Sequence, residues 1–200
     1  MTSATSTRTD FFGFLGLPRK LRIDMPDLEQ RYRALSRQFH PDYFYNAPPA
    51  ERRASLERSS YLNDAYRTLR SPIARIEYLL KLEGAAPEGP EQASKQVPPA
   101  LLEEVFALNE ELDEIREQKV NGVAAEQWKA RLARARQPIE AKRAEHETQL
   151  DELSAKWDAA LDAEASDTER RAVLDALRDR FLERNYINNL LAGIERELNS

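Results

Sequence analysis

The chain has 200 residues, no cysteine and a formal net charge of -5. This length allows one large domain or two small ones, and the missing cysteines exclude a disulfide framework, a thiolate metal site and a cysteine nucleophile. Charged residues make up 32% of the chain, and no apolar stretch reaches the roughly 18–20 residues of a membrane span, so we expect solvated helices in a reducing cytoplasm.

The charge is distributed unevenly along the chain. Residues 1–83 hold 14 Lys and Arg against 10 Asp and Glu, whereas residues 84–200 hold 16 against 25. A basic first part and an acidic second part suggest two modules with different partners, although ordinary surface variation would give the same pattern. Proline and glycine are frequent in residues 84–99. We therefore predict four segments: a disordered tail at 1–10, a first domain at 11–83, a linker at 84–98 and a second domain at 99–200.

The first domain opens with an apolar segment at 11–15, followed by an amphipathic helix. Asp24 is the expected N-cap of this helix, with Asp27 completing an Asp version of the capping box. Pro41 should end the helix, because the residue before a proline avoids helical angles. One face is an apolar stripe made of Leu28, Tyr32, Leu35 and Phe39.

A second long helix should begin near Pro48-Pro49 and pack antiparallel to the first, which leaves residues 40–47 as the exposed tip of a helical hairpin. Its buried positions are Leu62, Ala65, Tyr66 and Leu69. Ser71-Pro72 then starts a further helix, with serine as cap and proline in the first turn.

The second domain is predicted to be a three-helix bundle. Its first helix carries a coiled-coil-type seam of Leu101, Val105, Leu108, Leu112 and Ile115. Asn121-Gly122 predicts a turn, Pro138 should kink the next helix or mark its start, and Asp167 should cap the last helix. The predicted fold class is therefore all-α throughout.

Catalysis has little support in the sequence. His40 and His146 are the only histidines, and neither a nucleophile elbow nor a glycine-rich phosphate loop is present. We expect His146 to be a hydrogen-bonded residue at the boundary of its helix seam rather than a ligand. The sequence predicts no enzyme, no metal site and no bound cofactor.

The tripeptide His40-Pro41-Asp42 is the most informative motif. It follows directly on a helix whose outer face carries Arg33 and Arg37, with Arg31 on its flank. A basic face beside an exposed carboxylate suits an acidic partner surface, although three arginines can also be simply the solvated side of a helix.

The basic helix, the His-Pro-Asp tripeptide and the run Asn63-x-Ala65-Tyr66-x-x-Leu69 together resemble the J domain over about residues 11–80. The J domain stimulates ATP hydrolysis by seventy-kilodalton heat-shock chaperones. The resemblance implies that Asp42 engages an arginine of the chaperone, that Pro41 stiffens the turn and that His40 anchors it. It also implies that Arg31, Arg33 and Arg37 dock on the nucleotide-binding domain of the chaperone.

The remaining sequence narrows the resemblance to the HscB family of iron–sulfur cluster co-chaperones. The matching segments are 10–18, the Ser71-Pro72-x-x-Arg75-x-x-Tyr78-Leu79-Leu80 run, and Asn109-Glu110-Glu111-Leu112-Asp113. The resemblance implies an HscA-type chaperone and an IscU-type cluster scaffold as partners, and no cofactor in the chain itself.

Two apolar residues of the first bundle helix, Leu102 and Phe106, lie off the predicted seam, as does Phe181 on the last helix. Unburied apolar residues beside acids form an anchor with a charged rim, unless the stripe is merely wide and these residues are covered. The family resemblance makes this surface the scaffold-binding site, with matching positions Leu102, Phe106, Glu110, Glu114 and Phe181. Glu103 and Ala107 depart from the family pattern.

We therefore expect a two-domain co-chaperone that stimulates a chaperone ATPase and delivers the scaffold. A J protein for another client and a helical adaptor with an accidental tripeptide remain alternatives. The sequence pI of about 5.3 argues against nucleic-acid binding, and we expect no membrane association.

Overall fold

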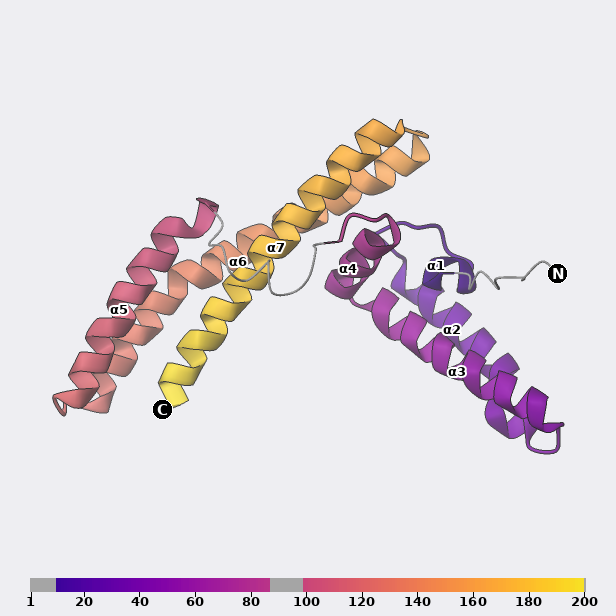
Figure 1. Cartoon of the computed structure of the whole chain (residues 1–200), viewed down its shortest axis with the longest axis horizontal. Helices are drawn as coiled ribbons and strands as arrows, with labels where there is room; N and C mark the ends of the chain where they lie inside the picture. Colours follow the sequence, from indigo (N-terminus) through magenta and orange to yellow (C-terminus); the bar gives the residue numbers. More distant parts are fainter. Residues whose placement is uncertain (1–9, 87–98, 200) are drawn as a thin grey trace, which may run out of the picture. The chain divides into compact units, whose positions relative to one another are not determined.

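A computed structural model describes residues 10–86 and 99–199 of the chain, and every regular element in these ranges is helical (Figure 1). The all-α prediction is thus confirmed. The described residues form two compact units: one combines 10–84 with 154–170, and the other combines 85–86 and 99–153 with 171–199. Within the described ranges, no helix is both long and apolar enough to span a membrane.

The predicted tail and linker fall almost wholly outside the described residues, and the predicted domain boundaries stay predictions. Asp10, which we assigned to the tail, belongs to the fold because it is the N-cap of helix α1 (Phe11–Phe14). Its carboxylate accepts a hydrogen bond from the Gly13 N–H at 2.9 Å and pairs with Arg19 at 2.6 Å. A cap satisfies backbone donors that the first helical turn would leave open.

Helices α2 (Met25–Phe39) and α3 (Pro49–Arg70) form the predicted antiparallel hairpin (Figure 1). The Tyr32 and Tyr66 rings stack with centroids 4.2 Å apart, and the Tyr32 hydroxyl donates to Asn63 Oδ1 at 2.9 Å. The predicted capping box is wrong: Asp24 is the N-cap but makes no side-chain cap bond. Asp27 lies beside Arg31 instead and accepts from its Nε at 2.8 Å.

Helix α4 (Pro72–Leu82) begins as predicted, with Pro72 in its first turn. The Ser71 hydroxyl accepts from the Ala74 N–H at 3.4 Å. Arg75 on this helix is buried, and its guanidinium donates to the Leu69 carbonyl at 2.7 Å and to the Leu21 carbonyl. These two bonds tie α4 to the end of α3 and to the segment before α2.

The first unit also contains the end of one long helix, α6 (Ala125–Asp162). The buried carboxylate of Asp158 accepts from the backbone N–H groups of Leu21 and Arg22, at 2.7 and 2.9 Å. The indole of Trp157 donates to the Arg19 carbonyl at 2.8 Å. Residues 19–22 lie outside the helices, so these backbone N–H and C=O groups have no partner within a helix. The side chains of Trp157 and Asp158 on α6 supply their hydrogen bonds.

The second unit is a three-helix bundle of α5 (Leu102–Val120), α6 and α7 (Asp167–Asn199), with the 3-10 turn η2 (Pro99–Leu101) before α5. The predicted seam residues join one core with residues of α6 and α7, although the first of them, Leu101, belongs to η2 and not to α5. The predicted turn at Asn121-Gly122 is present, and Gly122 has a φ of +72°, a left-handed backbone conformation that favours glycine. Pro138 lies inside α6 and does not mark its start.

Two expectations about α6 and α7 need correction. Ser166, rather than Asp167, caps α7: the Ser166 hydroxyl accepts from the Glu169 N–H at 3.3 Å, and the Glu169 carboxylate accepts from the Ser166 N–H at 2.9 Å. His146 is a core residue with 1% exposure, not a boundary residue. Its Nδ1 lies 3.3 Å from a carboxylate oxygen of Glu183 but has no hydrogen-bond partner in the described structure.

Asp158→Ala should lower the free energy of unfolding by about 1–3 kcal/mol, because it leaves two backbone N–H groups without an acceptor. Asp162→Ala is the matched control: Asp162 pairs with Lys20 at 2.6 Å on the surface, so its removal should cost less than about 1 kcal/mol. Urea unfolding measures both. Equal effects of the two substitutions would contradict the role of Asp158.

The stability of the second unit should fall in mild acid because of His146. Burial lowers the pKa of His146, and the charges of Arg180 and Lys142 lower it further. The imidazole of the unfolded chain titrates at about pH 6.5, so stability is lost as the pH falls through that value toward the lower pKa of the folded state.

Urea unfolding of wild type and of His146→Gln at about pH 7.5 and pH 6 tests this expectation. Burial raises the pKa of Glu183, which acts with the opposite sign but in both proteins. The wild type should therefore lose more stability than His146→Gln. An equal loss in the two proteins is inconsistent with a buried neutral imidazole.

Candidate functional site

The tripeptide lies at the tip of the α2–α3 hairpin, where α2 must stop. Phe39 is the last residue of α2, and its carbonyl accepts from the hydroxyls of Ser55 and Ser59 on α3, both at 2.8 Å. Carbonyls at a helix end lack intrahelical donors, and here two serines of the neighbouring helix supply them. The turn that follows therefore starts from a fixed point.

Residues Pro41–Phe44 form the 3-10 turn η1, which presents Asp42 to solvent. His40 caps this turn, because its Nδ1 accepts from the Asp42 N–H at 3.3 Å. Nδ1 also lies 3.5 Å from the Asp42 carboxylate, but a nitrogen that accepts the N–H has no proton to donate to it. The Asp42 side chain is 85% exposed, and no Lys or Arg of the described residues pairs with it.

The three arginines of α2 differ in what they contact. Arg31 is half-buried and donates to the Gly16 carbonyl at 2.7 Å as well as to Asp27. Gly16 has a φ of +66°, and a Cβ there would meet the Arg31 guanidinium at 2.9 Å. Arg31 therefore holds the segment after α1.

The other two arginines face solvent. Arg33 forms an i,i+4 pair with Glu29 at 2.6 Å, and Arg37 is exposed with no ion-pair partner among the described residues. Surface pairs of this kind are weak and exchange readily. Arg33 and Arg37 thus provide accessible positive charge on the helix that ends at the tripeptide.

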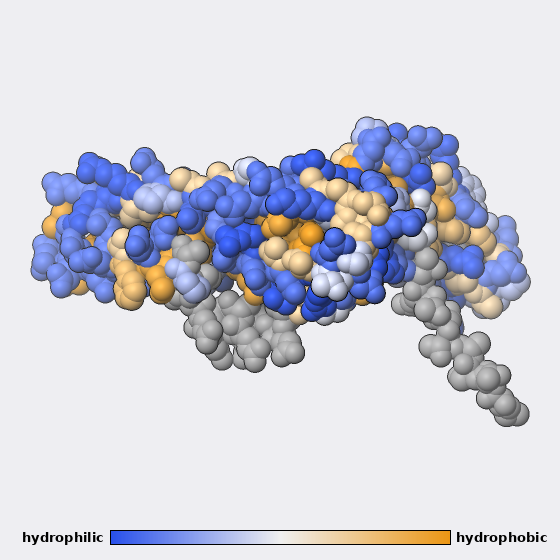
Figure 2. Space-filling model, turned by 90° about the horizontal axis from the view of Figure 1, so that it is seen from above, coloured by the Kyte–Doolittle hydropathy of each residue, from blue (hydrophilic) through white to orange (hydrophobic). Residues whose placement is uncertain are grey.

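On the second unit, α5 carries a row of exposed side chains at i+4 spacing: Leu102, Phe106, Glu110 and Glu114. Leu102 is 41% and Phe106 71% exposed, which confirms that both lie off the seam. We call the row of Leu102, Phe106, Glu110 and Glu114 the α5 face. Figure 2 shows mostly hydrophilic residues in the view it draws, with smaller hydrophobic areas between them.

Phe181 does not share this exposure. It is only 6% exposed, so the expectation that it lies off the apolar stripe of α7 is wrong. Leu174, Leu177 and Phe181 follow one another at steps of three and four, which places all three on the same buried face.

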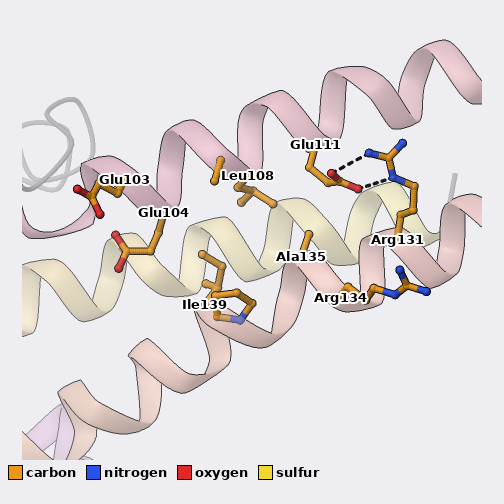
Figure 3. Close-up of a pocket in the computed structure, with 10 residues that line it drawn as sticks. Glu103, Glu104, Leu108, Glu111, Arg131, Arg134, Ala135 and Ile139 are labelled. Carbon is orange, nitrogen blue, oxygen red and sulfur yellow. Dashed lines mark hydrogen bonds and ion pairs between the residues drawn. The ribbon is translucent and has the colours of Figure 1, made fainter.

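A groove of about 620 Å³ lies between α5 and α6, beside the α5 face. Its apolar walls include Ala107, Leu108, Ala135 and Ile139, and its polar side chains include Glu103, Glu104, Glu111, Arg131 and Arg134. Figure 3 shows Glu103 and Glu104 toward one end and the two arginines toward the other. Sequence patterns did not reveal this groove, because it depends on how two helices separated by a turn pack together.

Arg131 is already engaged. Its guanidinium forms a bidentate pair with Glu111 at 2.7 and 2.9 Å and contacts Glu114 at 2.5 Å (Figure 3 shows the Glu111 pair). These carboxylates raise the pKa of Arg131. The arrangement ties α5 to α6 at one end of the groove.

The structure thus brings the predicted residues together as two groups. His40, Pro41 and Asp42 share the hairpin tip of the first unit, and Leu102, Phe106, Glu110 and Glu114 share one helix of the second. Among the described residues, no cluster of three or more His, Asp or Glu could hold a metal ion.

No protein-family profile matches the chain. Its structure is similar to that of chaperone HscB from Vibrio cholerae, with a TM-score of 0.61 and 27% identity over 96% of this chain and 98% of that chain. It is also similar to the crystal structure of human co-chaperone protein HscB, with a TM-score of 0.62 and 26% identity over 96% and 83% of the two chains. The predicted resemblance to HscB-type proteins and the predicted all-α fold are therefore confirmed.

Proposed function

We propose that this chain is a co-chaperone in iron–sulfur cluster assembly. Its hairpin tip stimulates the ATPase of an HscA-type heat-shock chaperone, and its α5 face holds an IscU-type cluster scaffold. The observation that carries the proposal is the Asp42 carboxylate, which is exposed and pairs with no Lys or Arg of the described residues.

Asp42 is suited to a charge-assisted hydrogen bond with an arginine of the chaperone. No ion pair with a Lys or Arg of the described residues must break before it binds, and the exposed carboxylate belongs to a turn that His40 caps. Pro41 fixes one backbone angle of that turn. Binding therefore costs little reorganisation of this segment.

Arg33 and Arg37 support docking by long-range charge. Both are exposed on α2, and such charges speed encounter and orient partners more than they add affinity. Arg31 contributes indirectly, by holding the segment at Gly16.

The α5 face supplies what a protein interface needs at its centre and rim. Leu102 and Phe106 offer apolar area already exposed to solvent, and Glu110 and Glu114 follow on the same row. Burial of such anchors contributes most of the affinity in many interfaces. Phe181 is buried on α7 and is therefore not proposed as a direct contact.

Asp42→Asn should reduce stimulation of an HscA-type ATPase at least tenfold, because the neutral amide loses the charge of the bond to the chaperone. Tenfold corresponds to about 1.4 kcal/mol, close to the lower end of the range of about 1.5–3 kcal/mol for a hydrogen bond to a charged group. Steady-state ATP hydrolysis measures the effect.

Asp167→Asn is the matched control, because it makes the same chemical change at an exposed position at the start of α7. Stimulation by this variant should equal that of wild type. The J-domain proposal fails if folded Asp42→Asn stimulates the chaperone as well as wild type does.

The double substitution Leu102→Ala with Phe106→Ala should weaken binding of an IscU-type scaffold by an order of magnitude or more, because both exposed anchors are lost. Isothermal titration calorimetry measures the dissociation constant. Val120→Ala removes another exposed apolar side chain from the same helix and should leave the dissociation constant unchanged. An unchanged constant for the folded double variant points to a different client.

A further inference from the structure

We infer that the groove between α5 and α6 is a second contact for the same scaffold, and that Arg134 receives a carboxylate of that partner. The occupant is a protein segment with an apolar side chain between a basic and an acidic residue. This inference rests on the proposed function and adds residues to its scaffold-binding site.

The groove adjoins the α5 face. Glu103 and Ala107 line the groove, and each follows directly on an exposed residue of that face, Leu102 or Phe106. Successive helix residues point about 100° apart, so these two groove residues face away from Leu102 and Phe106 themselves. The link is Glu114 of the α5 face, which accepts from Arg131 of the groove at 2.5 Å. A partner that covers the α5 face as far as Glu114 therefore reaches the groove.

The charges lining the groove are arranged along its length. Figure 3 shows Glu103 and Glu104 toward one end and Arg131 and Arg134 toward the other, with Leu108, Ala135 and Ile139 between them. A segment with a basic residue, an apolar residue and an acidic residue in that order complements this arrangement.

Only part of this charge is available to a partner. Arg131 is held by Glu111 and Glu114, and Glu104 lies 3.7 Å from Lys142. Arg134 is exposed and has no ion-pair partner among the described residues. It is therefore the cation of the groove that can bind a carboxylate without losing an existing pair.

Small side chains keep the groove open. Ala107 on α5 and Ala135 on α6 both line it, and the volume of about 620 Å³ is large enough for several side chains. An apolar side chain from the partner would cover Ala107, which is exposed, and Ala135, which is half-buried, whereas Leu108 and Ile139 are already buried in the bundle core.

Calorimetry with an IscU-type scaffold tests the role of Arg134. Arg134→Glu should weaken binding about fivefold or more, and this loss should shrink at high salt because the contact is electrostatic. Arg134→Lys should bind within about threefold of wild type, since it keeps the positive charge. Arg196→Glu makes the same charge change at an exposed position of α7 and should bind like wild type.

A crosslinking experiment locates the contact independently of affinity. The chain contains no cysteine, so Arg134→Cys and Arg196→Cys each offer a single attachment point for a maleimide photocrosslinker. The probe at position 134 should crosslink to the scaffold, and the probe at position 196 should not.

The outcomes separate this inference from the proposed function. If Leu102→Ala with Phe106→Ala weakens binding but Arg134→Glu and the probe at 134 have no effect, the groove is not part of the interface. If neither set matters, the scaffold proposal itself fails. Self-association, or loss of ATPase stimulation with scaffold binding unchanged in Arg134→Glu, would instead make a second copy or the chaperone the occupant and overturn the inference.

Discussion

The carbonyl of Phe39 is the point on which presentation of Asp42 depends. Two hydroxyls from α3, those of Ser55 and Ser59, donate to this carbonyl and close the end of α2. Pro41 prevents the helix from continuing, and His40 caps the next turn. The exposed carboxylate is therefore held at the hairpin tip by bonds to the backbone, and its own charge stays free for a partner.

The two candidate surfaces use different physics. The hairpin tip offers a single carboxylate and nearby arginines, which favour fast, oriented and salt-sensitive encounter. The α5 face offers Leu102 and Phe106, whose burial favours a longer-lived complex. A chain that joins the two raises the effective concentration of one partner near the other without any new contact.

Local patterns predicted much of the fold. The stripes of α2 and α3, the start of α4 at Ser71-Pro72 and the seam of α5 follow from spacing and capping residues. The contact of Asp158 with the segment 19–22 did not, because it joins residues more than 130 positions apart and leaves no periodic trace. The Ser166–Glu169 capping box is visible in the sequence as an S-x-x-E pattern, but we placed the cap one residue later, at Asp167.

The candidate site was predictable to the same extent. His40-Pro41-Asp42, Leu102 and Phe106 were found from sequence, whereas the inward position of Phe181 and the fixed contacts of Arg31 required three-dimensional packing. The central claim, that one chain links a chaperone to a scaffold, is tested most directly by retention of scaffold on immobilised HscA-type chaperone. The intact chain should increase retention, and substitution at either surface should abolish the increase while binding at the other surface persists. Retention that is unaffected by the chain, or by both substitutions, would contradict the account.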